Sequence, residues 1–95
     1  MGAAGTAVIS FGSTPGTSVV SVAVTGQAAI GAGAHAEAWF MLDSTATHNA
    51  YEHMMAPMFV KLPCGDVVPG VGFTIYGVTD MRIDGTFQVH WVWTN

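Results

Sequence analysis

Alternation of large apolar residues with small or polar ones, in short runs, is the pattern that most limits the fold of this chain. In the last run Phe87, Val89, Trp91 and Trp93 stand two residues apart, so an extended strand points all four to one face. We expect that face to be buried, because each large apolar side chain removed from water contributes about 1.5–3 kcal/mol. No stretch shows helical spacing over three turns, so the pattern predicts an all-β fold.

Short β-prone runs recur along the whole chain at intervals of roughly ten residues, which is typical of small antiparallel β domains. The predicted strands cover residues 7–11, 18–25, 35–42, 54–62, 73–79, 81–83 and 86–93. The sequence therefore predicts one β domain over residues 1–95. We expect a small antiparallel β-sandwich or barrel of about six or seven short strands, preceded by a short flexible N-terminus.

Turn residues separate the predicted strands. Pro15-Gly16, Pro63 to Asp66 and Pro69-Gly70 each combine residues that favour tight turns, and the small residues 27–34 read as a connection. Asp84-Gly85 between two alternating runs predicts a tight hairpin.

The most polar stretch, residues 45–53, is interpreted as an exposed loop. The alternative is one helical turn capped by Asp43 or Ser44, whose side-chain oxygens can accept free backbone N–H groups. Pro57 interrupts the strand predicted over residues 54–62, and because proline lacks an N–H it indicates an edge strand or a bulge.

Charged residues are scarce, at 8% of the 95 residues, whereas a soluble domain usually has about a quarter. Lys61 and Arg82 are the only basic ones, too few to neutralise a run of phosphates, so we expect no nucleic acid as partner. No apolar run approaches the roughly 20 residues that span a bilayer, so we expect no membrane partner. With so little charge, some apolar surface is expected to meet another protein.

One group of side chains could hold a metal: His48, Glu52 and His53, with Asp43 nearby. Their spacing matches no recognised set of zinc ligands, so we interpret them as polar loop residues and expect no metal. On that interpretation, replacing both histidines with alanine leaves stability unchanged. Cys64 would need a base within hydrogen-bond reach to act as a nucleophile, and we expect it to be structural. We therefore predict no enzyme activity, no catalytic residues and no cofactor.

Three methionines and two aromatic residues form the candidate interface. Methionine adapts to irregular apolar surfaces, so a methionine-rich edge strand can serve as an interaction surface, and ordinary core packing is the alternative. The charge deficit favours the interface. The candidate interface residues are Met54, Met55, Met58, Phe59 and Trp39.

Five segments of the chain carry a family resemblance: SVAVTGQ (21–27), HAEAWF (35–40), DSTATHNAYEH (43–53), GVGFTIY (70–76) and HWVW (90–93). With these segments, and from about residue 11 onward, the chain resembles a family of small, largely uncharacterised virion-associated proteins of tailed bacteriophages and prophages. The resemblance implies a structural component of the virion, assembled in the host cytoplasm, and it carries over no catalytic or binding residue.

This context leads us to expect a capsid decoration (cement) protein, which binds the major capsid protein or another virion protein and stabilises the head shell. We expect a homo-oligomer, a dimer or trimer, because closed symmetry hides apolar edges. A tail, fibre or head–tail connector component is the first alternative. A carbohydrate-binding module is the second, with Trp39, Trp91 or Trp93 as a stacking platform, although the alternation around Trp91 and Trp93 favours burial.

Overall fold

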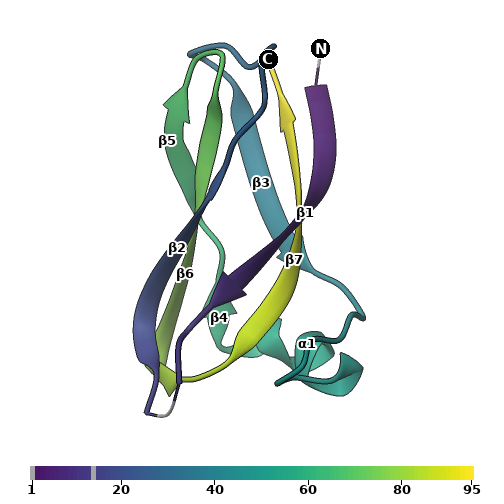
Figure 1. Cartoon of the computed structure of the whole chain (residues 1–95), viewed down its shortest axis with the longest axis vertical. Helices are drawn as coiled ribbons and strands as arrows, with labels where there is room; N and C mark the ends of the chain where they lie inside the picture. The colour runs from purple at the N-terminus through teal and green to yellow at the C-terminus, as the bar shows by residue number, and fades with distance from the viewer. Residues whose placement is uncertain (1, 14) are drawn as a thin grey trace.

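The computed structural model describes residues 2–13 and 15–95 and shows two antiparallel β-sheets packed face to face (Figure 1). The predicted all-β fold is confirmed, in its sandwich form. Within the described residues the elements are β1 (Gly2–Ser10), β2 (Thr17–Val24), β3 (His35–Phe40), α1 (Ala50–Met55), the 3₁₀ helix η1 (Ala56–Met58), β4 (Val60–Lys61), β5 (Cys64–Val68), β6 (Gly72–Ile83) and β7 (Thr86–Thr94).

One sheet has the strand order β1-β7-β3, and the other has the order β2-β6-β4, with β5 also paired to β6. The predicted hairpin at Asp84-Gly85 is therefore wrong, because β6 and β7 lie in different sheets and each has other strands on both sides. Gly85 instead pairs with the connection between β1 and β2. The Gly85 N–H donates to the Gly12 carbonyl, and the Gly85 carbonyl accepts from the Phe11 N–H at 2.8 Å. Asp84-Gly85 is thus a crossover between the sheets.

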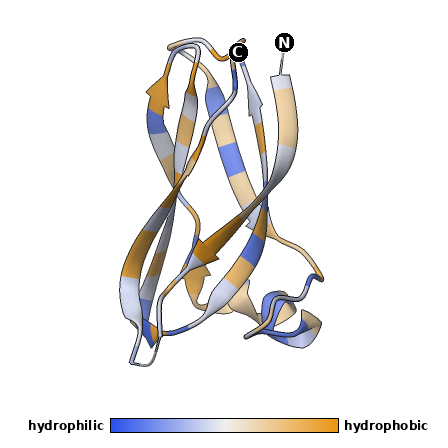
Figure 2. Cartoon of the chain, viewed as in Figure 1, coloured by the Kyte–Doolittle hydropathy of each residue, from blue (hydrophilic) through white to orange (hydrophobic). Residues whose placement is uncertain are grey.

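The core lies between the two sheets and takes its largest groups from β7. Phe87, Val89, Trp91 and Trp93 are all buried, as the alternation predicted. The outward residues between them remain partly exposed, and Figure 2 shows the matching alternation of hydropathy along β3. Gly5 pairs with Trp91 across the β1–β7 ladder, and a Cβ there would lie 2.6 Å from the indole ring, so the ring occupies the space that a side chain would need.

Two strands are longer than predicted. β1 begins at Gly2 instead of residue 7, because it pairs with β7 without a break from Gly2 opposite Thr94 to Ser10 opposite Thr86. Residues 2–6, which were expected to belong to a flexible lead-in, are thus part of the sheet, and Met1 lies outside the described residues. β6 is one continuous strand where two, residues 73–79 and 81–83, were predicted.

The turn predicted from Pro63 to Asp66 is also wrong. Cys64 begins β5 and pairs with Ile75 of β6, and a register shift follows before Val68. Asp66 has a positive φ of 51° within that irregularity, which is a conformation that aspartate tolerates better than most residues. Asp66 therefore forms part of a bulge within β5 and not a turn between strands. The turn predicted at Pro69-Gly70 is present, closed by the Val71 N–H on the Val68 carbonyl.

Candidate interaction surface and apolar pocket

Residues 41–59, here called the crossover segment, connect β3 of one sheet to β4 of the other and carry α1 at the lower end of the sandwich (Figure 1). The loop predicted for residues 45–53 is wrong from Ala50 onward, and so is the strand predicted for 54–62 apart from residues 60–61. The helix starts at Asn49, not at Asp43 or Ser44, with a reciprocal capping box. Asn49 Oδ1 accepts from the Glu52 N–H (2.9 Å), and Glu52 Oε1 accepts from the Asn49 N–H (2.8 Å).

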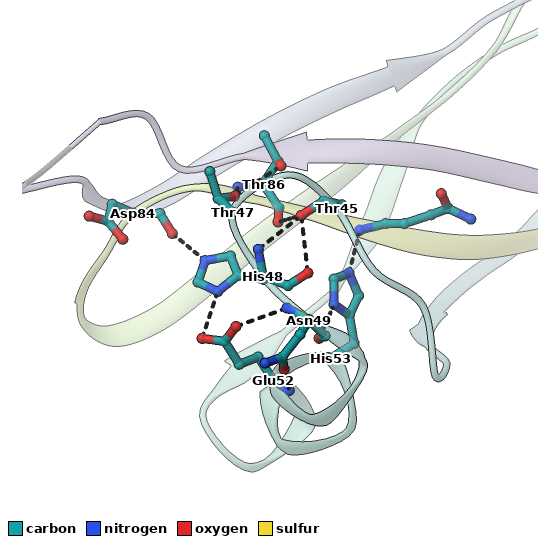
Figure 3. A network of polar contacts seen from close by, with 9 residues as sticks. Thr45, Thr47, His48, Asn49, Glu52, His53, Asp84 and Thr86 are labelled. Carbon is teal, nitrogen blue, oxygen red and sulfur yellow. Dashed lines mark hydrogen bonds and ion pairs between the residues drawn. The ribbon is translucent and has the colours of Figure 1, made fainter.

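His53 fastens this helix to the sandwich. Its ring is fully buried, and its Nε2 accepts from the Gln88 N–H of β7 at 2.9 Å, so the proton lies on Nδ1, which donates to the Asn49 carbonyl at 3.0 Å (Figure 3). The ring also meets Phe87 edge to face, at a centroid distance of 5.2 Å. His53 is therefore a structural residue that satisfies a buried backbone donor.

His48 lies flat on Phe87, with ring centroids 4.0 Å apart and an interplanar angle of 12°. Its Nε2 donates to the Asp84 carbonyl at 2.7 Å, and its Nδ1 lies 3.2 Å from Glu52 Oε2 (Figure 3). The backbone N–H of Asn49, and then His48, hold the pKa of Glu52 below its ordinary value, so its carboxylate is charged at neutral pH. The segment thus presents a carboxylate, paired with His48, beside an aromatic stack.

Two threonines fix the start of the segment to β7. Thr45 Oγ1 donates to the Thr86 carbonyl at 2.7 Å, and Thr47 Oγ1 accepts from the Thr86 N–H at 2.8 Å (Figure 3). Together with the bond from the Gln88 N–H to His53, these bonds hold residues 45–53 of the crossover segment against β7.

The four residues considered as metal ligands do not converge. Asp43 pairs with His90 of β7 at 2.6 Å, and both ring nitrogens of His53 are engaged with backbone groups. Within residues 2–13 and 15–95, no three His, Cys, Asp or Glu side chains are grouped so as to hold a metal ion. The contacts of His48 and Glu52 are those of a helix cap and of the pocket described next.

An apolar pocket of about 200 Å³ opens between α1, Phe59 and the ends of β6 and β7. Its walls are aromatic and aliphatic side chains, and Glu52 with His48 supplies the polar groups. The residues that line it are His48, Tyr51, Glu52, Met55, Phe59, Ile83 and Phe87. It is a site that the sequence did not predict, since it draws on three separate parts of the chain.

The candidate interface residues remain outside the core. The methionines lie on α1 and η1, Phe59 follows η1 directly, and Trp39 is on the outer face of β3, an edge strand of its sheet. Met58 is 75% exposed, Met54 50% and Trp39 40%, and Met55 is partly buried in the wall of the pocket. Trp39 and Pro57 line a second cavity of about 200 Å³, so β3 and η1 are neighbours at the surface.

Other exposed apolar residues of the same stretch were missed. Seven of the thirteen exposed large apolar residues in the described chain fall between residues 39 and 59. Three of these seven were not predicted: Met41 and Leu42, which follow Trp39 closely, and Tyr51, which precedes Met54. We call all seven the exposed apolar group: Trp39, Met41, Leu42, Tyr51, Met54, Met58 and Phe59.

Cys64 and the tryptophans have structural surroundings. Partial burial raises the pKa of the Cys64 thiol to about 11, so the thiol stays protonated at neutral pH, and its Sγ lies 3.8 Å from the Leu62 carbonyl. Trp91 and Trp93 are buried and offer no platform to a sugar ring. Trp39 alone of the three tryptophans is exposed, beside His90.

The fold and the surface together define a small β-sandwich with an apolar crossover segment. Comparison with protein-family models, with curated proteins and with solved structures finds no match for this chain. Within the described residues, no helix has the length and apolar character needed to cross a membrane.

Proposed function

We propose that this protein is a structural subunit of a bacteriophage particle, a decoration protein that binds the outer face of the head shell through its crossover segment and catalyses no reaction. The observation that carries the proposal is the exposed apolar group, gathered between residues 39 and 59. The phage context comes from the sequence resemblance, which covers the chain from about residue 11 onward.

The chemistry of this surface supports a protein as the partner. Interfaces between proteins are enriched in methionine and aromatic residues and depleted in lysine and glutamate, and the exposed apolar group has that composition. Its side chains lie outside the core, so their burial is still available to a partner. A head shell offers the same docking site many times, and oligomeric subunits would gain avidity from several modest contacts.

The proposal is tested by separating purified particles of the parent virus into heads and tails and probing each fraction for this chain. We expect it on heads, at a copy number that scales with the major capsid protein. Detection on tails in few copies would replace decoration by the fibre or connector alternative. Absence from both fractions would refute a virion role.

A matched pair of variants tests the surface itself. Met58→Glu changes a methionine of η1 that is 75% exposed, and Met81→Glu changes one of β6 that is 61% exposed, so neither substitution disturbs the core. We expect Met58→Glu to weaken binding to undecorated heads by at least about fivefold and Met81→Glu to leave it near wild type, because interface anchors cost more than 1 kcal/mol when lost. Equal behaviour of the two variants would refute this assignment of the surface.

A further inference from the structure

The pocket beside α1 has the size of a single side chain. Its volume is about 200 Å³, below the roughly 300 Å³ at which pockets for drug-sized ligands begin. Phe87 and Ile83 come from the ends of β7 and β6, while Met55 and Phe59 come from the crossover segment. Such a pocket suits one aromatic or branched aliphatic group that enters from outside, which is the usual form of an interface anchor.

The exposed polar group of this pocket is the carboxylate of Glu52, which is paired with His48 at 3.2 Å. Glu52 is the only Asp or Glu among its lining residues, and no Lys or Arg is among them. The carboxylate oxygens accept from the Asn49 N–H and lie against His48, which leaves about half of their roughly four acceptor sites free for a further donor. A positive group next to the apolar anchor would donate to these free acceptor sites. A negative group would find no free donor on His48, because both of its ring nitrogens are engaged, with Glu52 and with the Asp84 carbonyl.

We infer that this pocket binds a large apolar side chain of a partner protein that is flanked by a lysine or arginine. The inference rests on the proposed function, since it names the chemistry by which the crossover segment recognises its partner. The anchor fills the space between Met55, Phe59 and Phe87, and the flanking cation pairs with Glu52 at the rim.

Three small molecules of matched size test the pocket in the full chain: phenethylamine as the cation, 2-phenylethanol as the neutral analogue and 3-phenylpropanoate as the anion. Binding is followed by NMR through the methyl signals of Met55 and Ile83, with Met81 as a distant control signal. We expect saturable shifts at the first two residues, with affinity highest for the cation and lowest for the anion.

Two variants separate the charge from the apolar walls. Glu52→Gln keeps the capping box, because glutamine at this position makes the same bond to the N-cap backbone. It should weaken phenethylamine by about two- to fivefold and leave 2-phenylethanol unchanged. Tyr51→Ala removes an exposed wall and should weaken all three probes.

Absence of saturable shifts for phenethylamine would overturn the inference, and so would equal affinities for the three probes. Self-association that Glu52→Gln abolishes would also overturn it, because a second copy would then be the occupant. These outcomes are independent of the head–tail fractionation. Decorated heads with a pocket that binds no probe refute the inference alone, whereas probe binding without virion association refutes the proposed function alone.

Discussion

Replacing His53 with alanine should destabilise this protein strongly, although the sequence pattern placed that histidine in a polar loop. The ring is fully buried between α1 and β7 and bonds a backbone group of each, Asn49 and Gln88. Alanine leaves the Gln88 N–H without an acceptor, at a cost of about 1–3 kcal/mol. Loss of the ring contacts with Phe87, and the cavity left behind, add about 2 kcal/mol. The expected loss is therefore about 3–5 kcal/mol.

Such a loss is a large share of the total, since a chain of 95 residues is expected to have a free energy of unfolding of roughly 5–14 kcal/mol. Urea unfolding followed by tryptophan fluorescence measures it, because Trp91 and Trp93 are buried in the folded state and become exposed on unfolding. With a slope of about 1 kcal/mol per molar urea, the midpoint falls by about 3 M or more.

His35→Ala is the matched control. The His35 side chain is 74% exposed and lies 3.6 Å from Glu37, a surface pair whose loss should change stability by less than about 0.5 kcal/mol. If His53→Ala cost less than about 1 kcal/mol, the buried bridge between α1 and β7 would be refuted. The loop interpretation of residues 45–53 would then regain its support.

Three further substitutions or reactions probe the core, a crossover and the thiol. Trp91→Ala should cost about 3–5 kcal/mol in the same urea assay. Trp91→Phe should cost clearly less, because the buried indole Nε1 has no hydrogen-bond partner among the described residues. Equal costs for the two variants would contradict this. Gly16→Ala should cost at least about 1 kcal/mol more than Gly26→Ala in free energy of unfolding, which is the order of magnitude of a steric clash. Both glycines have a positive φ, but only at Gly16 would a Cβ lie 1.8 Å from a carbonyl oxygen, that of Ile83. Cys64, with its pKa raised to about 11, should react with iodoacetamide at pH 8 on the order of 100-fold more slowly in the folded chain than in urea. Because the folded chain keeps this proton while the unfolded chain loses it, stability should fall from about pH 9 to pH 11, and Cys64→Ala should remove that part of the slope.

Alternation in the sequence was sufficient for the faces of the strands, because burial of one side of a sheet acts directly on every second residue. It identified the buried row on β7. It could not identify strand partners. Asp84-Gly85 has the same turn chemistry in a hairpin and in a crossover, and the contact of Gly85 with Gly12, far away in the sequence, decides between them.

The short helix escaped for a different reason. Six residues make fewer than two turns, too few for helical periodicity to stand out. The capping-box residues Asn49 and Glu52 can be read from the sequence, but a capping box predicts a helix only when a longer apolar pattern follows it. The pocket depends on that helix, so it could not be found from the sequence either.

Few side chains of the crossover segment are needed for folding. His53 and Ala56 are its buried residues, and the threonines at its start provide the hydrogen bonds that hold it to β7. Polar side chains at positions 54 and 58 would leave those contacts intact and would keep the surface solvated at no cost to the core. The exposed methionines and aromatic residues therefore contribute little to the stability of the free chain. Under the proposed function, a partner would remove these side chains from water, and each could then contribute about 1.5–3 kcal/mol to binding.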